Sequence, residues 1–141
     1  MENVIITTTI NTPTFLEGIC KNLKRFKYGK NENSIIVIGD LKTPKTTNNF
    51  CQKLSSKYGY KINYFDIAFQ NSFFKKKYKI FYNFFPLNDA VRKLLGSIYL
   101  FKKLPNRVIF IDDDNYVNDQ KDFLKGHLVT NSKLKLNSVN S

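Results

Sequence analysis

Short runs of β-branched and other apolar residues alternate along most of the chain with longer segments of helical periodicity. The runs lie at residues 4–10, 35–38, 60–67 and 108–111. Between most of them, apolar residues recur every three or four positions, which is the spacing of one helix face. Strands that alternate with helices in this way form a parallel sheet. We therefore predict an α/β fold that is Rossmann-like, with a mostly parallel sheet of about four strands flanked by helices.

Capping residues indicate the limits of the first two predicted helices. Thr14 opens the first helix, with Glu17 three residues later as in a capping box. Thr46 or Thr47 caps the second helix, and Gly59 lies where a helix C-terminus favours glycine. We expect both helices to cover the sheet.

The two cysteines, Cys20 and Cys51, lie in these two predicted helices. They are too few for a disulfide framework, and their spacing does not suit a metal site. Because free cysteine is among the most buried residue types, we predict two buried thiols.

The region before the fourth run has a less regular pattern. Residues 68–85 are rich in Phe, Tyr and Lys without a clean period, so we expect a loop or an irregular helix there. A long helix is predicted to begin at residues 86–89. Gly96 inside it costs about 1 kcal/mol relative to Ala and indicates close packing. One face of this helix is predicted to be buried, with Arg92, Lys93, Lys102 and Lys103 off it; that face consists of Leu87, Ala90, Val91, Leu94, Leu95, Ile98 and Phe101.

The formal net charge of +12 indicates an anionic partner. The lysines are spread over the chain, and no predicted element carries a continuous basic stripe. Nucleic acid is therefore a weaker candidate than a small anion such as a nucleoside diphosphate. No run approaches the roughly 20 apolar residues of a membrane span, and the N-terminal residues lack the pattern of a signal peptide. We expect a cytoplasmic protein without a membrane span.

Polar residues follow three of the four predicted strands. They are Thr9 in the first segment, Asp40 after the second run, and residues 112–115 after the fourth. Ligands of open parallel sheets bind beyond the carboxyl ends of the strands, where the strand order reverses. We therefore expect these three segments to line one crevice.

Asp112, Asp113 and Asp114 form an acidic cluster directly after the fourth run. Adjacent carboxylates repel one another unless a cation neutralises them. Carboxylate oxygens suit Mg²⁺ or Mn²⁺, which share phosphate oxygens with a substrate. On extended backbone Asp112 and Asp114 point to the same side, so we predict that this pair addresses one metal ion. The alternative interpretation is a solvated acidic turn.

Arg92 lies near the opening turn of the long predicted helix. The N–H groups and the dipole of a helix N-terminus favour anions, and a guanidinium there binds a phosphate through two nitrogens. The alternative is that Arg92 and Lys93 only solvate one face of the helix.

Three segments together resemble a known family. They are residues 37–44 (VIGDLKTP), 85–96 (FPLNDAVRKLLG) and 111–115 (IDDDN), which occur in this order. The chain resembles the STELLO-type glycosyltransferase-like proteins over about residues 4–116. It is more distantly similar to the reversibly glycosylated polypeptides, which are UDP-arabinopyranose mutases, and to other GT-A glycosyltransferases with a DxD motif. Leu94 departs from the pattern, because the relatives usually have Asn at that position.

The resemblance implies a site and a substrate class. The donor is a nucleotide-diphosphate sugar, with a UDP-sugar as the first expectation, and the acceptor is a glycan or another hydroxyl group. The metal is Mn²⁺ or Mg²⁺, bound by Asp112 and Asp114. The residues expected to bind the nucleotide sugar are Thr9, Asp40, Arg92, Lys93, Asp112 and Asp113.

The length of the chain differs from that of a whole GT-A catalytic domain, which continues well past the DxD motif. We expect residues 1–117 to be the nucleotide-sugar-binding half-domain, and residues 118–141 to form a short helix and a polar tail that is a truncated continuation. No catalytic base for inverting transfer is visible. The chain is accordingly expected to be an N-terminal fragment, a half-domain that needs a partner, or a remnant without catalysis.

Three other functions stay open. The first is a nucleotide-binding remnant that is catalytically inactive. The second is phosphoryl transfer through an aspartyl nucleophile, since Asp112-x-Asp114 after an apolar strand resembles the opening motif of the haloacid dehalogenases. The third is a basic nucleic-acid-binding module, which predicts a steep salt dependence of binding.

Overall fold

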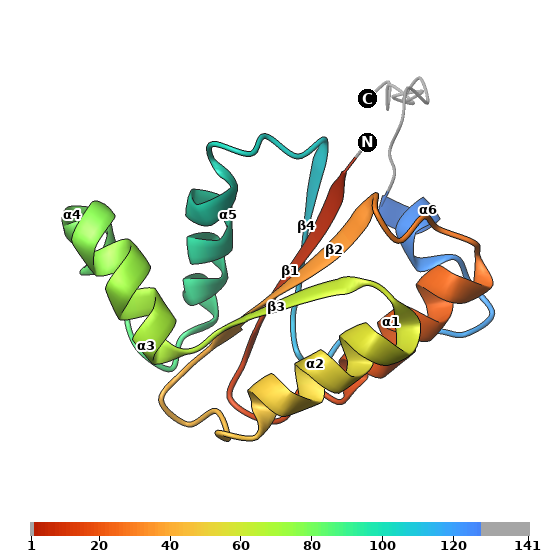
Figure 1. Cartoon of the computed structure of the whole chain (residues 1–141), viewed down its shortest axis with the longest axis horizontal. Coiled ribbons are helices and arrows are strands. Elements are labelled where there is room, and N and C mark those ends of the chain that lie inside the picture. The colour runs from red at the N-terminus through yellow and green to blue at the C-terminus, as the bar shows by residue number, and fades with distance from the viewer. Residues whose placement is uncertain (1, 128–141) are drawn as a thin grey trace, which may run out of the picture.

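The structure is a computed structural model that describes residues 2–127, and its centre is one parallel sheet (Figure 1). The strand order is β3-β2-β1-β4, with every neighbouring pair parallel. The strands are β1 Asn3–Thr9, β2 Asn33–Gly39, β3 Lys61–Phe65 and β4 Arg107–Ile111. This confirms the predicted Rossmann-like α/β fold with four parallel strands. The third strand is shorter than predicted, because Asp66 accepts a hydrogen bond from Phe69 N and starts a helix.

Two regular helices, α1 Phe15–Arg25 and α2 Thr47–Tyr58, cover one face of the sheet. Both cysteines are buried between these helices and the sheet, as predicted, and burial raises the pKa of the Cys20 thiol to about 12. The C-terminal end of α2 has the expected geometry, with Gly59 in the left-handed region at φ 82°. The predicted side-chain caps are wrong: Thr14 and Thr46 precede the helices with helical backbone angles, from which the hydroxyl forms no cap hydrogen bond.

A series of short helices covers the other face. They are α3 Ile67–Gln70, the π-helix η1 Asn71–Lys75, α4 Lys79–Tyr82, the 3₁₀ helix η2 Ala90–Lys93 and α5 Leu94–Leu100. The expected irregular helix at residues 68–85 is therefore confirmed. Gly96 packs directly on β1, since a Cβ atom at this position would lie 2.8 Å from Ile6 Cγ2. This contact confirms the close packing that Gly96 indicated.

The predicted buried face of the long helix is confirmed for Leu95 and wrong for most of its other residues. The residues of η2 and α5 that the structure buries are Arg92, Leu95, Gly96 and Leu100, whereas Leu87, Val91, Leu94 and Phe101 are exposed. The helix begins as a 3₁₀ turn, which has about three residues per turn and so rotates the following side chains away from the phase of an α-helix. Arg92 turns inward because Asp40 and Gln70 supply polar partners for it.

The chain after β4 returns to the α1 face and ends its described part in α6, Phe123–His127. The Asn22 side chain donates to the carbonyls of Asn118 and Lys121 and accepts from Phe123 N. Leu124 is fully buried in the core under α1. Residues 118–127 thus pack on the part of the chain that precedes them, and the rest of the predicted segment 118–141, with its polar tail, lies outside the described residues. Within residues 2–127, no helix is long and apolar enough to cross a membrane.

Candidate functional site

A cavity of about 180 Å³ opens at the carboxyl ends of β1 and β2, beside the start of the acidic turn that follows β4. It lies at the point where the strand order reverses, since β4 and β2 flank β1 on opposite sides. All three predicted polar segments contribute to its lining, which consists of Thr8, Thr9, Ile10, Asp40, Asn88, Asp89, Ala90 and Asp113. The topology therefore brings these segments together as the sequence predicted.

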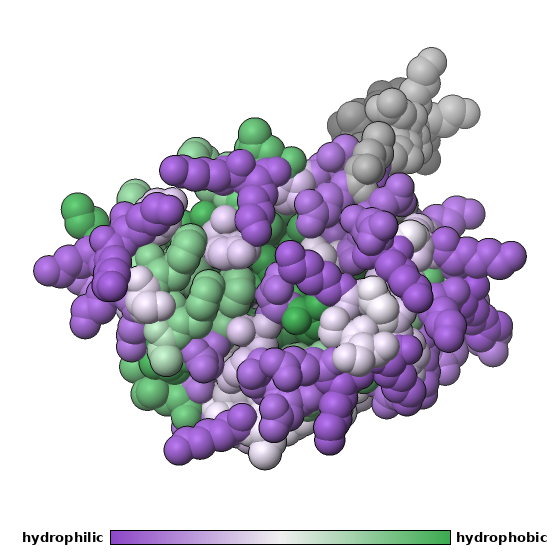
Figure 2. Space-filling view, in the orientation of Figure 1, coloured by the Kyte–Doolittle hydropathy of each residue, from purple (hydrophilic) through white to green (hydrophobic). Residues whose placement is uncertain are grey.

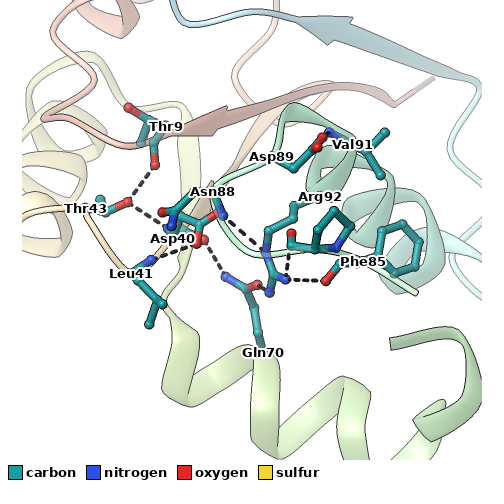
Figure 3. A network of polar contacts seen from close by, with 12 residues as sticks. Thr9, Asp40, Leu41, Thr43, Gln70, Phe85, Asn88, Asp89, Val91 and Arg92 are labelled. Carbon is teal, nitrogen blue, oxygen red and sulfur yellow. Dashed lines mark hydrogen bonds and ion pairs between the residues drawn. The ribbon is translucent and has the colours of Figure 1, made fainter. Parts of the chain in front are cut away.

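Asp40, which lines this cavity, is the centre of a polar network (Figure 3). One carboxylate oxygen accepts from Leu41 N at 2.8 Å, and the other accepts from Asn88 N at 2.6 Å. Thr43 connects the network to β1, because its hydroxyl donates to Thr9 O and accepts from Asp40 N. The Asp40 side chain therefore orders the turn at Asn88, which forms one wall of the cavity.

Arg92 lies below the cavity and is 1% exposed. Its guanidinium donates to Phe85 O, to Tyr82 Oη and to Gln70 Oε1, and its Nε lies 3.8 Å from Asp40 Oδ2. Gln70 in turn donates to the carbonyls at the ends of β2 and β3. The two terminal nitrogens of Arg92 donate to internal acceptors and its Nε lies beside Asp40, so the residue connects the short helices to the sheet and does not solvate a helix face. The binding of a phosphate by Arg92 stays a prediction.

The three acidic residues after β4 lie in different surroundings. Asp112 forms an ion pair with Lys93, with 2.6 Å between Oδ1 and Nζ. Asp113 lines the cavity together with Asp40. Asp114 is exposed, and among residues 2–127 neither it nor Asp113 has a side-chain hydrogen bond or ion pair. The chain turns after Asp112, where Asn115 N donates to Asp112 O, so the side-chain alternation expected of extended backbone does not continue.

The donor set at this turn fits a divalent cation only in part. Within the described part of the chain, no three His, Cys, Asp or Glu side chains are grouped closely enough to bind a metal ion. Mg²⁺ is commonly bound by one or two carboxylates together with substrate phosphates and water. Asp112 is paired with Lys93, so Asp113 and Asp114 are the two carboxylates of this turn that have no ion pair among the described residues.

A second cavity, of about 360 Å³, lies on the other side of Asp40. Its lining includes Lys45, Asn48 and Tyr64. Burial raises the pKa of the Tyr64 hydroxyl to about 12, so this group is neutral at physiological pH. The Tyr64 ring lies over Gly39, where a Cβ atom would come within 2.8 Å of the ring. Glycine at this position thus lets the tyrosine close one side of the cavity.

Three polar residues of the site were not identified from the sequence: Gln70, Asn88 and Asp89. Gln70 lies in the segment without a clean period, and its role depends on contacts with residues distant in sequence. Asn88 has a positive φ of 56°, which Asn tolerates better than most residues. Asp89 accepts a hydrogen bond from Val91 N, and its position just before a helix was the available signal for this cap.

Comparisons with known proteins give a likeness among solved structures. No protein-family model matches the chain, and no curated protein matches it. Among solved structures, the chain is similar to S. aureus TarS, a glycosyltransferase, with a TM-score of 0.50 and 17% sequence identity. The alignment covers 90% of this chain and 19% of TarS, so the chain spans about a fifth of that protein's length. The likeness shows that the chain shares its Rossmann-like α/β fold with part of that protein.

Proposed function

We propose that the chain binds the donor substrate of a glycosyltransferase, a nucleotide-diphosphate sugar, at the carboxyl ends of β1, β2 and β4. The observation that carries the proposal is the convergence of Thr9, Asp40 and Asp113 on one cavity at the reversal of strand order. Nucleotides bind at this position in open α/β sheets. The glycosyltransferase fold supports sugar transfer as the chemistry.

The charge of the cavity supports a role for a divalent cation. Its lining contains three aspartates, Asp40, Asp89 and Asp113, and no lysine or arginine. A diphosphate cannot approach these carboxylates without a cation between them, by simple charge repulsion. We propose Mn²⁺ or Mg²⁺, bound by Asp113 and Asp114 and sharing phosphate oxygens; as a Lewis acid it would stabilise the leaving diphosphate.

The size of the cavity indicates which part of the ligand it binds. About 180 Å³ is less than the roughly 300–1,000 Å³ of a typical small-molecule site. We propose that the nucleoside, with UDP as the first candidate, occupies this cavity against Thr9 and Asp40. The diphosphate and sugar then extend over the exposed acidic turn. Lys93 lies beside that turn, where its ammonium group is positioned to leave its ion pair with Asp112 and pair with a phosphate.

Transfer to an acceptor is a further proposal, because the chain corresponds to about a fifth of TarS. The acceptor is proposed to be a glycan or another hydroxyl compound. A nucleotide-sugar binder without turnover is the alternative, and a donor-hydrolysis assay distinguishes the two.

Calorimetric titration of the chain with UDP, with and without Mn²⁺, tests the binding proposal. We expect Mn²⁺-dependent affinity that falls about tenfold or more in Asp113→Asn and Asp114→Asn, since each removes a charged ligand. Asp119→Asn is the matched control, because Asp119 is an exposed acid away from the cavity. Affinity that is unchanged by Mn²⁺, or equal losses in all three variants, would contradict the proposal.

A further inference from the structure

A basic and apolar surface lies over α4 and the end of α5, away from the candidate site. Five large apolar residues there are between 63% and 79% exposed: Ile80, Phe81, Phe84, Phe101 and Leu104. Six exposed lysines lie among them in sequence: Lys75, Lys76, Lys77, Lys79, Lys102 and Lys103. We call these eleven residues the basic apolar surface. Figure 2 shows apolar side chains gathered over this part of the molecule, in contrast to the hydrophilic surface over α1 and α2.

Aromatic contacts join the two segments of this surface. The ring centroids of Phe73 in η1 and Tyr99 in α5 lie 5.3 Å apart. Lys77 Nζ lies 5.4 Å from the Phe73 centroid, and Lys103 Nζ lies 4.4 Å from the Tyr99 centroid. Lys77 and Lys103, from segments far apart in sequence, therefore lie over two neighbouring aromatic rings.

The charge of this part of the chain is strongly one-sided. Between residues 67 and 107 the sequence contains nine basic residues and a single acid, Asp89. Arg92 and Lys93 are paired with acids from elsewhere, but among the described residues none of the six surface lysines forms an ion pair. Positive charge is thus concentrated where large apolar side chains are exposed.

We propose that the basic apolar surface binds the surface of an anionic lipid bilayer. Interfacial binding combines apolar side chains that enter the headgroup region with lysines that contact anionic lipids. Lysines are suited to this, because their stems lie along apolar surface while the charged ends stay in water. The proposal is independent of nucleotide binding at the candidate site.

A membrane surface explains the aliphatic residues better than nucleic acid does. Single-stranded nucleic acid stacks its bases on aromatic rings in a positively charged groove. Ile80 and Leu104 offer no such stacking, yet they are 74% and 79% exposed. Both lie next to lysines in sequence, Lys79 and Lys103, so cationic groups are close to these apolar side chains along the chain.

Sedimentation of the whole chain with lipid vesicles tests the proposal. Vesicles of phosphatidylcholine are compared with vesicles that also contain phosphatidylglycerol. We expect binding only to the anionic vesicles, with a loss of about fivefold for each lysine removed in Lys76→Ala and Lys79→Ala. The double variant Phe84→Ser/Phe101→Ser is expected to lose about tenfold or more, because two rings no longer enter the interface.

Matched controls separate this surface from general charge and from misfolding. Lys21→Ala with Lys24→Ala removes two exposed lysines of α1, and Tyr116→Ser removes an exposed ring beside the acidic turn. These controls are expected to bind vesicles like the parent chain, and every variant is expected to keep its melting temperature. The variants of the basic apolar surface are also expected to keep their UDP affinity.

Several outcomes would overturn the proposal. They are equal binding to both kinds of vesicle, equal losses in the α1 variant, or no effect of the two serine substitutions. Preferential binding of a single-stranded oligonucleotide, measured in parallel, would identify nucleic acid and not a membrane as the partner of this surface. If light scattering shows a dimer that dissociates in Phe84→Ser/Phe101→Ser, the partner of this surface is a second copy of the chain.

Discussion

Residues 2–65 and residues 67–104 both contain many large apolar side chains, but they bury them to very different extents. Only two large apolar residues of the first region are exposed, Ile10 and Leu41, whereas eight of the second region are exposed. The first region is built from helices of 11 and 12 residues, and the second from helices of four to seven. Apolar residues at helical spacing are therefore buried only where a regular α-helix continues over several turns.

The largest expected difference concerns the polar connection between the two regions. In Arg92→Ala, Asp40 loses its buried cation and Gln70 loses its partner. We expect the free energy of unfolding to fall by about 3–5 kcal/mol. Lys93→Ala removes an adjacent cation whose partner Asp112 is exposed, and should cost about 0–1 kcal/mol. Urea unfolding of both variants measures the contrast, and equal losses would show that the buried network does not join the regions.

An intermediate difference concerns packing. Ile36→Val removes one methylene from a residue that is 1% exposed in β2, and should cost about 1 kcal/mol. Phe84→Ala removes a whole ring from a residue that is 77% exposed, and should change stability by less than about 0.5 kcal/mol. The smaller deletion is thus expected to be the more destabilising in urea unfolding. The reverse order would mean that the second region is packed in solution.

The smallest expected effect lies on the surface of the first region. Lys57 lies 2.8 Å from Glu17, and its hydrogen bond lowers the pKa of that carboxyl below 4.5. A lowered folded pKa stabilises the fold above the unfolded value and loses this effect as the pH falls through the folded value. Lys57→Ala should therefore lower the free energy of unfolding slightly at neutral pH and leave it unchanged in acid. Thermal melts at several pH values test this, and a constant difference would contradict it.

The fold was predictable because local signals agreed with one another in the first region and in β4. Runs such as residues 35–38 were read correctly as buried strands, and Gly59 ended α2 as expected. The face of α5 was not predictable, because the 3₁₀ start and the inward turn of Arg92 depend on Asp40, 52 residues earlier in the sequence. The sequence alone does not indicate that a charged residue within an apolar pattern will turn inward toward a buried partner.

The candidate site was predictable at the level of segments and less so at the level of side chains. The parallel sheet fixes where Thr9, Asp40 and the acidic turn lie, so their convergence followed from the strand order. Which aspartate lines the cavity depends on the turn after Asp112. The extended-backbone argument favoured Asp112 and Asp114, whereas the family resemblance had included Asp113. The ligand roles of these residues stay predictions.

The segment that carries the acidic turn is fixed at both of its ends. Ile111 belongs to β4, which pairs with β1, and the carbonyl of Asn118 accepts a hydrogen bond from the buried Asn22. A short loop with fixed ends samples few conformations before any ligand arrives. Less conformational entropy then remains to be lost on binding, so the ligand proposed for these aspartates would need fewer contacts for a given affinity than it would on a freely moving loop.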